Sequence, residues 1–268
     1  FHYLDYVVNN NLNIGLFEAI IWQSSDENFE RGYDVHYLNP IIFYRPVEFS
    51  KHSPDNALLG LNIDYSFKSV NFYGQLLIDD LNINRYENTG DGFFQNKLAF
   101  QLGVKSQFSI NDHKFNFLSE FNQAQPYTYA HKHPMQNYTH MNQALAHPLG
   151  ANFKENIVML NYNLKKWVVN FKYTYARYGA DSVNTHYGQN IFISDFLASG
   201  EGGEFSYGNY NGQGIMTKLN TLYAEVSYDL KFAKAFVAYA SRKKSYEINS
   251  NYIVLGIRTN FVNPFIDF

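Results

Sequence analysis

The stretch KLAFQLGVKSQFSINDHKFNFLSEFN, residues 97–122, decides the fold. Apolar and polar side chains alternate along it in two runs, which meet at the polar turn cluster Asn111-Asp112-His113. The apolar positions are Leu98, Phe100, Leu102, Val104, Phe108, Ile110, Phe115, Phe117 and Phe121. A period of two residues predicts strands with one apolar and one polar face, so the stretch is a β-hairpin. Each arm runs for about a dozen residues, close to the roughly 9–11 tilted residues that cross a bilayer.

The same alternation recurs along the whole chain. The further strands are expected at residues 1–8, 12–22, 57–67, 70–78, 158–164, 167–175, 222–230, 233–239 and 253–261. Short connections, at residues 9–11, 68–69, 111–113, 165–166 and near 231, alternate with long ones. Short periplasmic turns and long extracellular loops are typical of bacterial outer-membrane barrels. We therefore predict an all-β fold, a transmembrane antiparallel up-and-down β-barrel of the bacterial outer membrane, as a single domain over residues 1–268.

Two features leave alternatives open. Glu18 stands on the apolar face of its segment, and a charge facing lipid is costly, so the facing of that strand is not decided. A soluble β-sandwich or lipocalin-like barrel would show the same alternation. Arm length, the one-sided loops and a belt of rings near the short turns favour the membrane barrel. The belt consists of Phe67, Phe72, Phe108, Phe115, Tyr162, Trp167, Tyr228 and Phe232.

Composition excludes several classes of protein. The 268 residues hold 23 Tyr and 24 Phe, more rings than a soluble core needs, and no cysteine, which removes disulfides and thiolate sites. The formal charge of -3 gives no basic surface for nucleic acid. The sequence contains no run of about 18 apolar residues, which a membrane-spanning helix would need, so we predict no such helix. The first residues also lack an export signal, so that signal was cleaved or lies upstream.

The strand count carries a further expectation. One partial strand followed by five up-down pairs is an odd number, whereas a single-chain barrel with both ends in the periplasm needs an even number. We therefore expect further strands upstream of Phe1.

Several short motifs, spread over nearly the whole chain, give a family resemblance. They are LNIGLFE (12–18), YLNP (37–40), FYRPVEF (43–49), DNALLG (55–60), GDG (90–92), PYTY (126–129), NYTH (137–140) and AHPLGAN (146–152). With them the chain resembles the Wzi-like capsule-assembly family, and more closely the Bacteroidetes gliding-motility outer-membrane proteins of the RemB type. The resemblance implies the carboxy-terminal part of a barrel of about 18 strands, of which roughly 11 lie here. It also implies extracellular loops that hold surface polysaccharide.

No motif predicts catalysis or a metal centre. His131, His133, His140 and His147 share one loop, but their spacing fits no standard metal site, and Pro134 interrupts it. Serines such as Ser119 and Ser194 lack a Gly-x-Ser-x-Gly elbow. We expect no enzymatic activity, no metal and no cofactor.

Glycan recognition needs rings that pack on sugar C–H faces and polar groups that fix orientation. The long loops supply such candidates, although each of them could equally serve only to fold its loop. The candidates are Tyr37, Tyr44, Arg45, Glu48, Tyr127, Tyr129, Tyr138 and Asn142. The polar face of the strands carries both signs of charge, which suggests a salt-bridged interior rather than an ion-selective pore.

Two functions therefore remain open. The first is attachment or assembly of surface polysaccharide, that is, capsule or exopolysaccharide. The second is an accessory role in a gliding-motility or protein-secretion assembly of the outer membrane. The expected partners are outer-membrane lipid, surface polysaccharide and other outer-membrane proteins.

Overall fold

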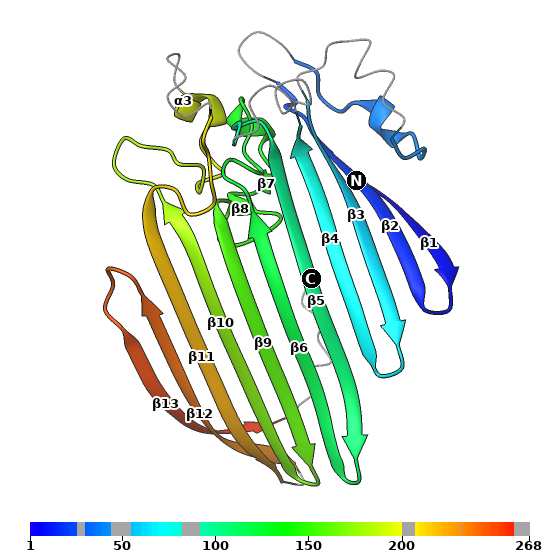
Figure 1. Cartoon of the computed structure of the whole chain (residues 1–268), viewed down its shortest axis with the longest axis vertical. Coiled ribbons are helices and arrows are strands. Elements are labelled where there is room, and N and C mark those ends of the chain that lie inside the picture. The colour runs from blue at the N-terminus through cyan, green and yellow to red at the C-terminus, as the bar shows by residue number, and fades with distance from the viewer. Residues whose placement is uncertain (26–29, 44–54, 82–91, 200–206, 231, 260–268) are drawn as a thin grey trace.

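The computed structural model describes residues 1–25, 30–43, 55–81, 92–199, 207–230 and 232–259. Eleven antiparallel strands form one sheet in which chain neighbours pair in sequence order, apart from a small hairpin in one loop (Figure 1). The strands of the large sheet are β1 (His2–Asn9), β2 (Leu12–Ile21), β3 (Asn56–Phe67), β4 (Val70–Asp80), β5 (Lys97–Ile110), β6 (His113–Ala124), β9 (Phe153–Leu164), β10 (Trp167–Ala180), β11 (Ile215–Asp229), β12 (Ala233–Lys244) and β13 (Ser250–Thr259). The predicted hairpin is β5–β6, and its register pairs Phe108 with Phe115.

The sheet is open. β1 and β13 are its two edges, so the described strands by themselves do not close a barrel. The expectation of further strands upstream stays a prediction. Among the described residues, no helix has the length and apolar character needed to cross a membrane.

The two faces of the sheet differ as the alternation predicts. We call outer the face that carries Leu61, Leu76 and Phe100, which are cross-strand partners, and inner the opposite face. Large apolar side chains of the outer face are widely exposed, for example Leu102 at 58% and Ile253 at 70%. Such exposure is typical of a surface made for lipid.

Seven rings of the predicted belt lie on this outer face beside the short turns, whereas Phe232 lies just before β12. Phe108 stacks on Phe115 with centroids 5.0 Å apart, Phe115 is 5.0 Å from Tyr162, and Trp167 is 4.8 Å from Tyr228. Rings from β5, β6 and β9 thus form a line across the sheet, as expected of an interfacial girdle.

Glu18 lies on the outer face but not near the middle of a strand. It pairs with Leu59 at the loop end of β2 and β3, it is 3% exposed, and its Oε1 lies 2.8 Å from Nδ1 of His2. The acid is therefore shielded by the chain itself at the rim, which resolves the ambiguity in the sequence pattern.

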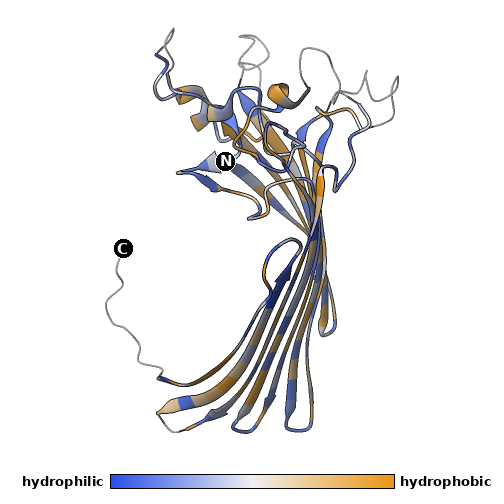
Figure 2. Ribbon diagram, turned by 90° about the vertical axis from the view of Figure 1, so that its left-hand side faces the viewer, coloured by the Kyte–Doolittle hydropathy of each residue, from blue (hydrophilic) through white to orange (hydrophobic). Residues whose placement is uncertain are grey.

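At the loop end, the inner face is apolar rather than polar. Strand residues from β2 to β10 form one buried cluster there with residues of the long loops, and Figure 2 shows these loops gathered at the end opposite the short turns. The cluster consists of Phe17, Ala19, Leu58, Leu77, Ala99, Ala124, Tyr129, Ala151, Phe153, Tyr178 and Ile191. The loops therefore pack onto the sheet as a small folded unit.

Candidate functional site

The loop between β6 and β9 turns back over the inner face through two tyrosines in the left-handed region. Tyr127 has φ of 65° and Tyr129 has φ of 74°, which costs energy for residues other than glycine. Backbone hydrogen bonds hold both, because the Tyr127 N–H donates to the carbonyl oxygen of Gly188 (3.0 Å) and the Tyr129 N–H donates to Oδ2 of Asp79 (2.7 Å). A Cβ at Gly188 would lie 2.5 Å from the Tyr127 nitrogen, so this close approach requires glycine.

A small hairpin projects from the same loop. Its strands are β7 (Thr139–His140) and β8 (Gln143–Ala144), with Asn142 exposed at the tip and in the left-handed region at φ 61°. Behind the hairpin, the Tyr138 N–H donates to the Tyr129 carbonyl oxygen (2.8 Å), and the two rings stack at 6.1 Å.

Asn152 joins this loop to the one between β10 and β11. Its fully buried side chain donates from Nδ2 to the carbonyl oxygens of Gly179 (3.1 Å), Tyr187 (3.1 Å) and Gln213 (3.0 Å). Its Oδ1 accepts the N–H of Gly212 (2.6 Å). The two N–H groups of Nδ2 are thus shared among three carbonyl oxygens, of which that of Tyr187 also accepts a hydrogen bond from Nε2 of Gln213 (2.9 Å).

A buried ion pair fixes the far end of the second loop. Lys97 Nζ lies 2.6 Å from Oδ2 of Asp195, the first residue of the short helix α3 (Asp195–Ser199), and both side chains are 2% exposed. The same ammonium donates to the carbonyl oxygen of Ala130 (2.8 Å). The lysine therefore ties both long loops to the start of β5.

A partly open cavity of about 330 Å³ lies between the loops and the inner face, and we call it the loop chamber. Aromatic rings and side-chain amides line the chamber. The rings are those of Phe1, Tyr3, Phe17, Phe100, Tyr129, Tyr138, His147 and Phe153, and the amides are those of Gln123 and of four inward-facing residues, Asn62, Gln75, Gln101 and Asn122. The four inward-facing amides stand in one cross-strand row, because Asn62 pairs with Gln75, Gln75 with Gln101, and Gln101 with Asn122.

Hydrogen bonds orient most of this row. Gln75 Nε2 donates to Oδ1 of Asn62 (2.8 Å), and Asn122 Nδ2 donates to Oε1 of Glu120 (2.8 Å). His147 Nε2 lies 3.0 Å from Oε2 of Glu155, and the His147 ring stacks on Phe153 at 4.3 Å. The chamber thus offers fixed amide donors and acceptors beside ring faces, which is what a polyhydroxylated ligand needs.

The predicted tyrosines differ in their placement. Tyr129 and Tyr138 both line the chamber, where burial raises the pKa of each phenol. Tyr127 was expected to offer its ring to a glycan, but the structure buries the side chain fully. Its OH donates to the His186 carbonyl oxygen (3.0 Å). Its closeness to the second loop explains this, and the loop sequence gave no sign of that contact.

The other predicted residues are scattered. Tyr37 lies apart from the chamber in the segment after β2, where its OH donates to Asp55 and its ring is 5.0 Å from Trp22. Asn142 stands at the β7–β8 tip. Tyr44, Arg45 and Glu48 lie outside the described residues. The glycan role of the whole set stays a prediction.

Sequence reasoning missed the amide row and His147 as site residues. Asn62, Gln75, Gln101 and Asn122 are recognisable in the sequence only as inward-facing positions of four strands. Which of the inward rows meets the loops depends on the tertiary fold.

The histidines form no metal centre in the described part of the chain. His131 and His133 are neighbours with ring centroids 6.1 Å apart, and the backbone N–H of His133 donates to Nδ1 of His131 (3.2 Å). Burial, with the nearby charge of Lys97, lowers the pKa of His131 to about 4. His131 is therefore a neutral hydrogen-bond acceptor at physiological pH.

Comparisons with known proteins bear on the fold. No family model matches the chain, and no curated protein matches it in sequence. Among solved structures, the chain is similar to Wzi of Escherichia coli, an outer-membrane protein involved in group 1 capsule assembly and a carbohydrate-binding β-barrel. The TM-score is 0.58 at 13% identity, and the match covers 97% of this chain. OmpT, an outer-membrane protein of Vibrio cholerae, also matches, with a TM-score of 0.37 at 10% identity over 96% of this chain and 62% of its own.

The match to Wzi covers 51% of the Wzi chain, so this chain spans about half of that protein's length. An identity of 13% shows likeness of fold alone. The long strands, the exposed apolar face, the ring belt and this likeness agree. The chain therefore has the Wzi-like fold of a bacterial outer-membrane β-barrel.

Proposed function

We propose that this chain belongs to a barrel in the bacterial outer membrane whose extracellular loops attach or assemble surface polysaccharide, and that the loop chamber contacts the glycan. The observation that carries the proposal is the chamber itself, in which a cross-strand row of amides faces Tyr129 and Tyr138. Amides can donate to and accept from sugar hydroxyls, while rings pack on the C–H faces of sugars. Likeness of fold to a carbohydrate-binding barrel supports the proposal by analogy.

Removal of two amides tests this role. Gln75 and Gln101 line the chamber from neighbouring strands, and neither belongs to the buried loop core. If each amide makes one hydrogen bond to the glycan, Gln75→Ala with Gln101→Ala should cost about 2 kcal/mol, which is roughly thirtyfold in affinity. The measurement is the amount of polysaccharide that stays on the cells.

The matched control is Gln143→Ala, which removes an exposed amide from the β7–β8 hairpin outside the chamber. Heat-modifiable migration on gels shows whether each variant is inserted and folded. A folded double variant that retains polysaccharide as well as Gln143→Ala does would refute the chamber as the glycan contact.

A second candidate is an accessory role in a gliding-motility or protein-secretion assembly. It is favoured by apolar side chains exposed on the long loops, Met135 at 71%, Met141 at 84% and Val183 at 85%, because such surfaces can dock proteins. In that case Met141→Ser with Val183→Ser should lose co-purifying outer-membrane proteins or cell movement, while polysaccharide retention is unchanged.

A further inference from the structure

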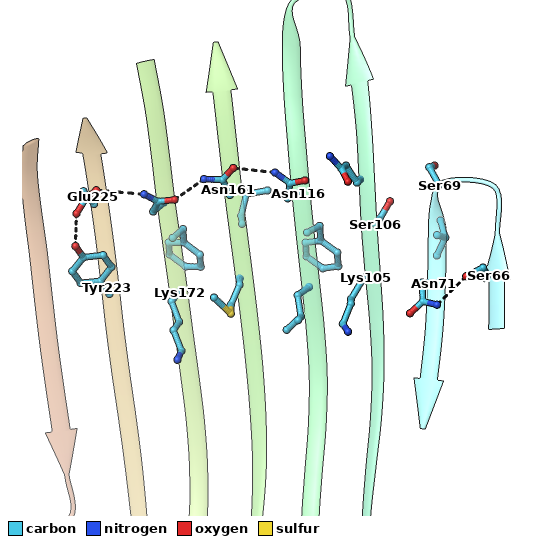
Figure 3. A pocket seen from close by; sticks show the side chains of 18 of the residues that line it. Ser66, Ser69, Asn71, Lys105, Ser106, Asn116, Asn161, Lys172, Tyr223 and Glu225 are labelled. Carbon is cyan, nitrogen blue, oxygen red and sulfur yellow. Dashed lines mark hydrogen bonds between the residues drawn. The ribbon is translucent and has the colours of Figure 1, made fainter. Parts of the chain in front are cut away.

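A second hollow lies on the inner face, nearer the short turns, and we call it the turn-side groove (Figure 3). It has a volume of about 950 Å³ and shares no lining residue with the loop chamber. Strands β3, β4, β5, β6, β9, β10 and β11 and the β3–β4 turn contribute its walls, together with Arg258 of β13. Its size is that of a site for a ligand of several rings.

A ladder of asparagines crosses the groove. Asn116 Nδ2 donates to Oδ1 of Asn161 (3.0 Å), Asn161 Nδ2 donates to Oδ1 of Asn170 (2.6 Å), and Asn170 Nδ2 reaches Oε1 of Glu225 (3.4 Å) (Figure 3). Arg258 also pairs with Glu225 at 3.1 Å. Glu225 is the acid among the described residues that line the groove. Arg258 balances its charge and Asn170 donates to it, so Glu225 offers no unpaired negative charge to a cationic ligand.

Three lysines line the groove, Lys68 in the β3–β4 turn and Lys105 and Lys172 on strands that cross it. Lys105 and Lys172 are exposed, and neither forms a salt bridge with another described residue. Lys105 lies over the Tyr73 ring at 4.3 Å. Two acids on neighbouring strands already have other partners. Glu120 on β6 accepts hydrogen bonds from Tyr73 (2.5 Å) and Asn122 (2.8 Å), and Glu155 on β9, on which the charge of Lys172 acts, lies 3.0 Å from His147.

The register fixes the spacing of the two charges. Lys105 pairs with Leu118, Leu118 with Met159, and Met159 with Lys172. The lysines are three strands apart, about 14 Å at ~4.8 Å per strand, with two apolar side chains between them. A polymer that carries negative charges at regular intervals, with apolar C–H faces between them, could pair its charges with the two lysines and pack its C–H faces on the two apolar side chains.

We propose that the turn-side groove binds a carboxylate-bearing saccharide chain across Lys105 and Lys172, with sugar rings over Leu118 and Met159, so that the polysaccharide held by this protein is acidic. This inference rests on the function proposed above and adds the chemical class of the glycan. The asparagine ladder supplies fixed amides along the same groove, and the lysines supply charge selectivity.

Two probes that differ only in charge test the proposal. The protein, with its full natural chain in detergent micelles, is titrated with an oligogalacturonate and with the same oligosaccharide methyl-esterified on every carboxylate. We expect the acid to bind about tenfold more tightly, because two partly exposed ion pairs contribute up to about that much. Lys105→Gln with Lys172→Gln should remove most of this preference, because the affinity for the acid falls more than the affinity for the ester.

The matched control is Lys154→Gln with Lys243→Gln. Both lysines lie on the outer face, since they alternate with inward residues, and this variant should keep the preference. Equal affinity of the natural protein for acid and ester would overturn the inference while leaving the proposed function intact. Binding of neither probe would overturn both. Equal binding of an oligoglutamate would replace the saccharide with an acidic peptide.

Discussion

His131 shows how one side chain can make the loops sensitive to acid. It accepts a backbone hydrogen bond at Nδ1, and Lys97, which lies near it, is buried in an ion pair with Asp195. A proton on Nδ1 would remove the acceptor and add a positive charge near that lysine. The sequence suggested only a histidine-rich loop, because the neighbourhood of His131 is set by β5 and α3, which are distant in the chain.

The sign of the expected pH effect follows from the pKa. His131 has a folded pKa of about 4, below the ordinary value near 6.5 of the unfolded chain. Between these values the unfolded state binds more protons, so the free energy of unfolding should fall as the pH drops from about 6.5 to 4. His131→Asn keeps an acceptor without titrating. Unfolding at pH 7.5 and pH 4.5 should therefore show a smaller loss in the variant, and equal losses would contradict this role.

At the scale of elements, the strands could be predicted and their loops could not. All eleven strands lie where the alternation places them, because a period of two follows directly from strand geometry. β10 continues to Ala180 and β11 begins at Ile215, beyond the predicted segments. Tyr178 and Ala176 are buried on the inner face there, so the polar-inside pattern fails where the loops cover the sheet. The chamber was unpredictable for the same reason.

Asn152 couples these elements, and its removal should be costly. Asn152→Ala removes the side-chain partner of the Gly179 and Gln213 carbonyl oxygens and of the Gly212 N–H, whereas the Tyr187 carbonyl oxygen keeps its hydrogen bond from Gln213. The free energy of unfolding should therefore fall by on the order of 3 kcal/mol. Asn184→Ala is the matched control, since Asn184 is exposed and has φ of 61° against 57° for Asn152. Both variants carry the same backbone cost. Denaturant unfolding in micelles measures the difference, and similar losses in both would refute the coupling.

The whole molecule combines a lipid-facing sheet with loops folded onto its inner face. Short turns at one end and a packed loop unit at the other give the sheet a direction across the membrane. The sequence predicted this polarity from the lengths of the connections alone. The salt-bridged interior that the mixed charges suggested is only partly present. Arg258–Glu225 and Lys234–Asp229 pairs form on the inner face, whereas asparagines occupy much of the rest.

The central claim is that the strands cross the outer membrane with the folded loops outside the cell. Single cysteines are introduced at Gln143, in the exposed loop hairpin, and at Lys165, in the β9–β10 turn, and the unsubstituted protein serves as the labelling control. Intact cells are treated with a membrane-impermeant thiol reagent, and permeabilised cells show that both sites can react. Labelling at position 143 and none at position 165 on intact cells is the expected result. Strong labelling at position 165 on intact cells would contradict the account.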